Sequence, residues 1–69
     1  MPSGGIQVDG TKIRDGRINQ GLSLTELARR VGVSKSFIST IERGHRRPSP
    51  SVAAGIADVL GVSIQEIRL

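Results

Sequence analysis

The chain has 69 residues, 36% of them hydrophobic, and no cysteine, so it forms one small domain braced neither by disulfides nor by a thiolate-bound metal. Ten Lys and Arg residues against six Asp and Glu residues give a net charge of +4, which favours a polyanionic partner such as nucleic acid. The single histidine excludes a zinc site, and the single aromatic residue excludes a stacking platform for single-stranded nucleic acid. No apolar run approaches the roughly 20 residues of a membrane span and no signal peptide is evident, so we expect a cytoplasmic protein.

Residues 1–9 are rich in Gly and Ser and lack a helical period. We expect them to form a flexible N-terminal arm that precedes a single domain at residues 10–69. The alternative is that Ile6 and Val8 pack back on the core or against a partner.

The first helix is predicted to begin at Gly10, because Ile13, Arg17 and Ile18 lie at helical spacing, and to end before Gly21. A second helix follows Ser23, which forms a capping-box pattern with the glutamate three positions later, Glu26. Its predicted apolar face consists of Leu24, Leu27, Ala28 and Val31, and Gly32 ends it.

Three more helices follow in the same manner. Ser34 is expected to cap the third helix, which turns Ile38 and Ile41 inward and stops at Gly44. After a basic loop, Ser49 caps a fourth helix that begins at Pro50 and ends at Gly61. Its apolar stripe is Val52, Ala53, Ile56, Val59 and Leu60. A second capping box, Ser63 with Glu66, opens a short fifth helix through Ile67, so the fold class is all-α.

Residues 24–43 carry the pattern of a helix-turn-helix, two short helices joined by a turn that contains glycine. Ala28 is small where the second helix crosses the first, and Gly32 supplies the left-handed conformation that reverses the chain. Val33 fills the corner, and Ser34 caps the following helix.

The stretches GLSLTELARRVGVSKSFISTIERG and PSPSVAAGIADVLGVSIQEI resemble the lambda-repressor-like DNA-binding domains of the Cro/cI or XRE type, over residues 11–67. The resemblance implies a compact five-helix domain that binds double-stranded DNA, usually as a dimer on a palindrome. It also implies a sequence-specific transcriptional regulator, expected to be a repressor, with no catalytic residues, metal, cofactor or small-molecule ligand.

The resemblance implies that the helix at residues 35–43 enters the major groove. Its outward positions, which would face the bases, are Lys35, Ser36, Ser39 and Thr40. Phosphate contacts are expected from Thr25, Ser34, Arg43, His45, Arg46 and Arg47. The alternative for both sets is a solvated surface. Leu24 departs from the family, whose members often carry a phosphate-binding Gln there, so that contact must come from backbone N–H groups or Thr25.

Other charged and aromatic residues have two interpretations each. By resemblance, Arg17 and Glu42 form a partly buried pair between the first and third helices; otherwise they are separate solvated charges. Phe37 either fills the edge of the core or abuts a sugar or a thymine methyl. Arg29 and Arg30 point away from the core and are either solvated or additional contacts.

Three further hypotheses concern function and assembly. An antitoxin on the same scaffold would add a toxin as partner, with the arm at residues 1–9 as its binding segment. An enzyme is disfavoured, because no nucleophile–base pair or Gly-rich phosphate loop is present. A homodimer is expected at least on DNA, through an apolar patch left over at the end of the chain: Ile64, Ile67 and Leu69.

Overall fold

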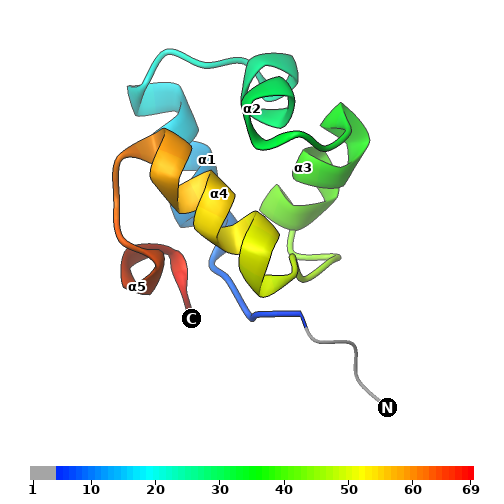
Figure 1. Cartoon of the computed structure of the whole chain (residues 1–69), viewed down its shortest axis with the longest axis vertical. Helices are drawn as coiled ribbons and strands as arrows, with labels where there is room; N and C mark the ends of the chain where they lie inside the picture. The colour runs from blue at the N-terminus through cyan, green and yellow to red at the C-terminus, as the bar shows by residue number, and fades with distance from the viewer. Residues whose placement is uncertain (1–4) are drawn as a thin grey trace.

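The computed structural model describes residues 5–69, which form five helices (Figure 1). Their bounds are α1 Gly10–Asn19, α2 Leu24–Val31, α3 Lys35–Glu42, α4 Pro50–Leu60 and α5 Ile64–Ile67. The expected all-α class is confirmed over these residues, where the one β-type contact is an isolated bridge between Val8 and Arg68. The third helix ends one residue earlier than expected, at Glu42, and Arg43 is its C-terminal cap.

Serine side chains start three of the helices. The hydroxyls of Ser23, Ser34 and Ser49 each accept a hydrogen bond from the backbone N–H three residues later, at 3.0, 3.1 and 3.2 Å. These bonds satisfy N–H groups that have no partner within the first turn. The α2–α3 turn depends on Gly32, whose φ of +91° is a left-handed conformation that other residues adopt only with strain.

One of the two expected capping boxes is incomplete. At the start of α5 the carboxylate of Glu66 accepts a hydrogen bond from the Ser63 N–H at 2.8 Å, as expected. At the start of α2, however, the carboxylate of Glu26 accepts hydrogen bonds from two arginines one turn further on. A carboxylate facing guanidinium groups at i+3 and i+4 gains charge-assisted hydrogen bonds, which outweigh the single bond to the cap.

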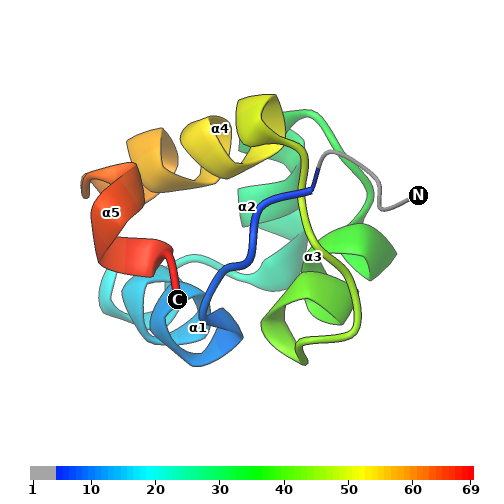
Figure 2. The same ribbon diagram turned by 90° about the horizontal axis from the view of Figure 1, so that it is seen from below.

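The N-terminal segment at residues 5–9 differs from the flexible arm expected there. Val8 is buried in the core and Ile6 packs against it. The Ile6 N–H donates to the Pro48 carbonyl at 2.8 Å, and the Asp9 N–H donates to the Ile67 carbonyl at 2.7 Å. The segment therefore lies between the α3–α4 loop and the C-terminal end, as Figure 2 shows, and corresponds to the alternative expectation for Ile6 and Val8. The remainder of the expected arm, residues 1–4, lies outside the described residues.

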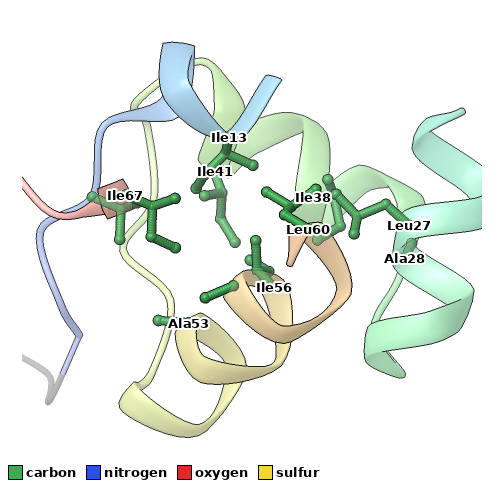
Figure 3. Packing of buried hydrophobic residues seen from close by; sticks show 11 residues of the cluster. Ile13, Leu27, Ala28, Ile38, Ile41, Ala53, Ile56, Leu60 and Ile67 are labelled. Atoms are coloured by element: carbon green, nitrogen blue, oxygen red, sulfur yellow. The ribbon is translucent and has the colours of Figure 1, made fainter. Parts of the chain in front are cut away.

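The core joins side chains from all five helices (Figure 3). Its completely buried members are isoleucine, leucine and alanine: Ile13, Leu27, Ile38, Ile41, Ala53 and Ile56. Ile67 is only 2% exposed and belongs to this core, so the expected dimerisation patch of Ile64, Ile67 and Leu69 is wrong for Ile67. In a domain this small, even the last helix contributes to the core, and α5 packs against α1 and α4. Of the other two, Ile64 is half-buried and Leu69 is 75% exposed.

The helix-turn-helix is formed by α2 and α3, which pack against each other beside α4 (Figure 1). Its corner residues Leu27 and Ala28 are buried, and Val31 and Val33 are partly buried against the core. Within residues 5–69, no helix has the length and apolar character needed to cross a membrane.

Candidate nucleic-acid interface

Two buried isoleucines determine which face of α3 reaches solvent. Ile38 and Ile41 are fully buried, three residues apart. The positions between and before them are therefore left outside: Lys35 and Ser36 are exposed, and Ser39 and Thr40 are partly exposed. The four residues expected to face bases thus share one accessible helix face.

The hydroxyl of Thr40 is already used within the helix. It donates to the Ser36 carbonyl at 2.6 Å, so it retains lone pairs to accept a hydrogen bond but has no proton to donate outward. This changes the chemistry expected for Thr40, because it can offer a partner an acceptor oxygen and a methyl group only. Ser36 and Ser39 carry no such internal side-chain hydrogen bond within residues 5–69.

A shallow hollow borders α3 on the side of α2. Its lining includes Leu24 together with four residues of α3 and its cap: Lys35, Ser36, Ser39, Thr40 and Arg43. Leu24 is partly buried against the core, so its apolar side chain forms one wall of this hollow. Thr25, the next residue, is exposed.

The N-terminus of α3 is exposed at Ser34. Its hydroxyl oxygen accepts the Phe37 N–H, which leaves the hydroxyl proton free to donate outward. A second hollow lies on this side of the helix, lined by Ser34, Ser36, Phe37, Thr40 and Arg46.

The basic loop that follows α3 is held at both ends. At its start Gly44 has a φ of +81°, and the His45 N–H donates to the Thr40 carbonyl at 3.0 Å. At its end Pro48 is buried and its carbonyl accepts the Ile6 N–H. The side chains between these ends project into solvent, because Arg43, His45, Arg46 and Arg47 are all exposed.

Glu42 is the one carboxylate between Lys35 and Arg47, and Arg17 of α1 neutralises its charge. Glu42 accepts hydrogen bonds from the Nε and Nη2 atoms of Arg17 at 2.7 and 3.2 Å. The third arm of that guanidinium, Nη1, donates to the Leu22 carbonyl at 2.9 Å. The expected pair between the first and third helices is therefore present, and both side chains are largely buried. The cations around α3 face solvent without an exposed carboxylate from their own segment.

Arg29 and Arg30 were expected to be solvated charges or additional contacts, and both pair with Glu26. Hydrogen bonds from Arg29 and then Arg30 hold the pKa of the Glu26 carboxyl below its ordinary value. The same carboxylate raises the pKa of Arg29. These pairs are solvent-exposed, so screening leaves them little effect on stability.

Two residues at the start of α1 have structural roles that were not predicted from the sequence: Asp9 and Gly10. Asp9 lies in the segment expected to be a flexible arm, but its carboxylate caps α1 and accepts a hydrogen bond from the Thr11 N–H at 3.0 Å. An aspartate directly before a helix is a usual cap and could have been recognised. Gly10 lies against the end of α3 so closely that a Cβ there would overlap the Glu42 carbonyl group. No short sequence pattern predicts this contact, because Gly10 and Glu42 are far apart in the sequence.

The geometry defines a helix-turn-helix domain with a basic exposed face, and the comparisons agree. A family model described as Helix-turn-helix matches residues 13–67. The chain belongs to this family of transcriptional regulators, and its resemblance to the lambda-repressor-like, XRE-type domains is confirmed.

Relatives in bacteria carry the same domain. The HTH-type transcriptional regulator SinR of Bacillus subtilis is 39% identical over 59 residues, which cover 84% of this chain and 53% of SinR. An uncharacterized HTH-type transcriptional regulator of Mycobacterium tuberculosis, Rv0474, is 43% identical over 56 residues, or 81% of this chain. The chain spans about 40% of the length of that relative.

Solved structures show the same arrangement of helices. SinR in complex with DNA matches with a TM-score of 0.76 at 40% identity, covering 81% of this chain and 90% of that chain. The restriction-modification controller protein C.AhdI from Aeromonas hydrophila matches with a TM-score of 0.78 at 32% identity, covering 83% of this chain and 86% of that chain. At 40% and 32% identity, both proteins resemble this chain in sequence as well as in fold.

Proposed function

We propose that this protein is a sequence-specific transcriptional regulator that inserts α3 into the major groove of double-stranded DNA. The observation that carries the proposal is the charge arrangement on α3 and the loop after it. Lys35, Arg43, Arg46 and Arg47 reach solvent there, while the only carboxylate of that segment, Glu42, is held by Arg17. A face with unopposed cations attracts the phosphate backbone and brings the helix to the groove.

The base contacts are proposed for the exposed face of α3. Lys35 donates to guanine N7 or O6, and Ser36 and Ser39 donate to or accept from base edges. Thr40 accepts a hydrogen bond or places its methyl group against a thymine methyl, because its own proton is bound to the Ser36 carbonyl.

The phosphate contacts surround this face. We assign them to Thr25 and Ser34 at the helix starts and to the exposed side chains after α3, namely Arg43, His45, Arg46 and Arg47. Support comes from the free hydroxyl proton of Ser34 and from the solvent exposure of the four loop side chains. Contacts of this kind fix the orientation of the protein on the duplex but carry no sequence information.

The protein is proposed to act in the cytoplasm as a repressor, bound as a homodimer to a palindromic operator. Two copies related by a two-fold axis would present their α3 helices about 34 Å apart, one turn of DNA. Ile67 cannot contribute to the dimer surface because it is in the core; Leu69 remains available. An operator that overlaps its own promoter would make the bound dimer a steric block to transcription.

The antitoxin alternative receives no support from residues 5–9. The expected toxin-binding arm is residues 1–9, of which residues 1–4 lie outside the described residues. In residues 5–9, backbone groups are hydrogen-bonded to the α3–α4 loop and to the C-terminal end. A partner would have to displace these contacts, so we favour the regulator.

The proposal is tested by mobility shift on the DNA upstream of the protein's own gene, with an unrelated duplex as competitor. We expect a specific complex that Lys35→Ala weakens. Thr40→Val keeps a methyl group and Thr40→Ser keeps the hydroxyl, so a methyl contact predicts that only Thr40→Ser loses preference for thymine. Equal competition by the unrelated duplex would refute sequence-specific binding at that region.

A further inference from the structure

Arg46 differs from the other cations around α3 in lying over an aromatic ring. Arg43, by comparison, donates from Nε to the Ser39 carbonyl of its own helix at 3.4 Å. The guanidinium carbon of Arg46 lies 5.1 Å from the centroid of the Phe37 ring. This is within the range of a cation–π interaction. No acceptor within residues 5–69 receives a hydrogen bond from Arg46, so its guanidinium N–H groups remain available for an external oxygen.

The ring that holds Arg46 is itself fixed. Phe37 lies on α3 and is partly buried against the core. This position matches the interpretation in which Phe37 fills the edge of the core. Its ring also lines the hollow that contains Ser34, Ser36 and Thr40. Arg46 therefore lies beside the exposed face of α3 although it belongs to the loop after that helix.

The backbone on either side of Arg46 restrains it as well. The loop begins with the hydrogen bond from His45 to Thr40 and ends at buried Pro48. On the far side of the loop, a Cβ built on Gly5 would lie only 2.6 Å from the Cβ of Arg47, so the N-terminal segment is packed against the loop there. Both ends of the loop are held, and the Phe37 ring gives the exposed Arg46 side chain a contact within the domain.

We propose that Phe37 is a positioning residue for DNA binding, whose ring holds the Arg46 guanidinium in place for a phosphate beside α3. The inference rests on the proposed function. A long cation ordered before binding loses less side-chain entropy when the complex forms than a freely rotating one does. Arg46 then contributes more to affinity than Arg47, which has the same charge but no aromatic neighbour among the described residues.

The test is a double-mutant cycle on DNA affinity, measured by fluorescence anisotropy with a duplex that the parent protein binds. Phe37→Leu removes the ring and keeps an apolar side chain, whereas Phe37→Tyr keeps an aromatic face. We expect Phe37→Leu to weaken binding about two- to five-fold in the parent and to have no further effect in Arg46→Ala. Phe37→Tyr should bind like the parent, and Phe37→Leu should remain additive with the control Arg47→Ala.

Two readouts separate positioning from a purely structural role of Phe37. The salt dependence of binding should become less steep in Phe37→Leu, toward that of Arg46→Ala, although no charge has been removed. In the free protein, the ring current of Phe37 should shift the Arg46 side-chain protons upfield in the NMR spectrum, and Phe37→Leu should abolish that shift.

Additive effects of Phe37→Leu and Arg46→Ala, or a Phe37→Tyr variant as weak as Phe37→Leu, would overturn the inference. A parent protein that binds no duplex would instead refute the proposed function, and the ring-current shift would then report the contact without any role in binding.

Discussion

Arg17 on α1 and Glu42 at the end of α3 form a two-point ion pair, with 2.7 Å between Nε and Oε2. Their side chains are only 12% and 7% exposed. The same guanidinium donates to the Leu22 carbonyl in the α1–α2 connection. One arginine therefore joins the first helix, the start of the helix-turn-helix and the end of α3, which fixes the tilt of the exposed α3 face.

We predict that Arg17→Met lowers the free energy of unfolding by about 3 kcal/mol, because the Glu42 carboxylate is left buried without a counter-charge. The double variant Arg17→Met with Glu42→Leu should recover most of this loss. Urea denaturation followed by circular dichroism measures both. If the double variant were as unstable as the single one, the unpaired carboxylate would not be the cause.

A second prediction concerns backbone conformation at the corner of the helix-turn-helix. Gly32→Ala should cost about 1–3 kcal/mol of unfolding free energy, because alanine is strained at positive φ even though its Cβ would meet open space. Gly55→Ala is the matched control within α4, where a Cβ would meet Val31 Cγ1 at an ordinary 3.5 Å. The control should stabilise the helix by about 0.5–1 kcal/mol. Thermal unfolding of the two variants should shift in opposite directions, and a shared direction would contradict this account of the turn.

A third prediction tests the packing of the N-terminal segment. Val8→Ala removes two buried methyl groups and should lower stability by about 1–2 kcal/mol. Gln7→Ala, one residue earlier and exposed, should change it by less than about 0.5 kcal/mol. Equal stabilities of Val8→Ala, Gln7→Ala and the parent would show that residues 5–9 behave as the flexible arm that composition indicated.

The helices were predictable because residues next to each boundary determine where the helix begins or ends. The helix starts carry serine caps, at Ser23, Ser34 and Ser49. Two helix ends carry glycine, at Gly32 and Gly61. Each of these residues is recognisable from its immediate neighbours in the sequence. The inward face of α3 followed from the spacing of its isoleucines for the same reason.

The features that local sequence patterns do not predict depend on partners far along the chain. Val8 is buried because Pro48 and Ile67 lie beside its segment, and nothing near Val8 in the sequence indicates that. Ile67 lies in the core and not in the expected surface patch. An apolar residue near the end of a chain fits either a core or an interface. The Glu26 carboxylate has two possible local partners, the backbone N–H of the cap residue Ser23 and the arginines one turn further on. The spacing of these residues does not show which partner it binds.

The fourth prediction concerns how affinity responds to salt. If a dimer neutralises about six phosphates, the logarithm of the binding constant should fall with the logarithm of salt concentration with a slope of about −5. Arg47→Ala should weaken binding to all sequences to the same degree and make this slope shallower by about 1 per site. Anisotropy titrations over a series of salt concentrations measure the slope. A slope near zero would contradict phosphate contacts by the cations around α3.

Recognition of a DNA sequence by α3 is tested by selection from a randomised duplex library. The purified chain is incubated with the library, bound DNA is recovered over several rounds, and the enriched sequences are determined. We expect two inverted half-sites about one helical turn apart, with preferences that change when Ser36 or Ser39 is replaced by alanine. A pool that stays random after selection, or an enriched site unaffected by either replacement, would contradict it.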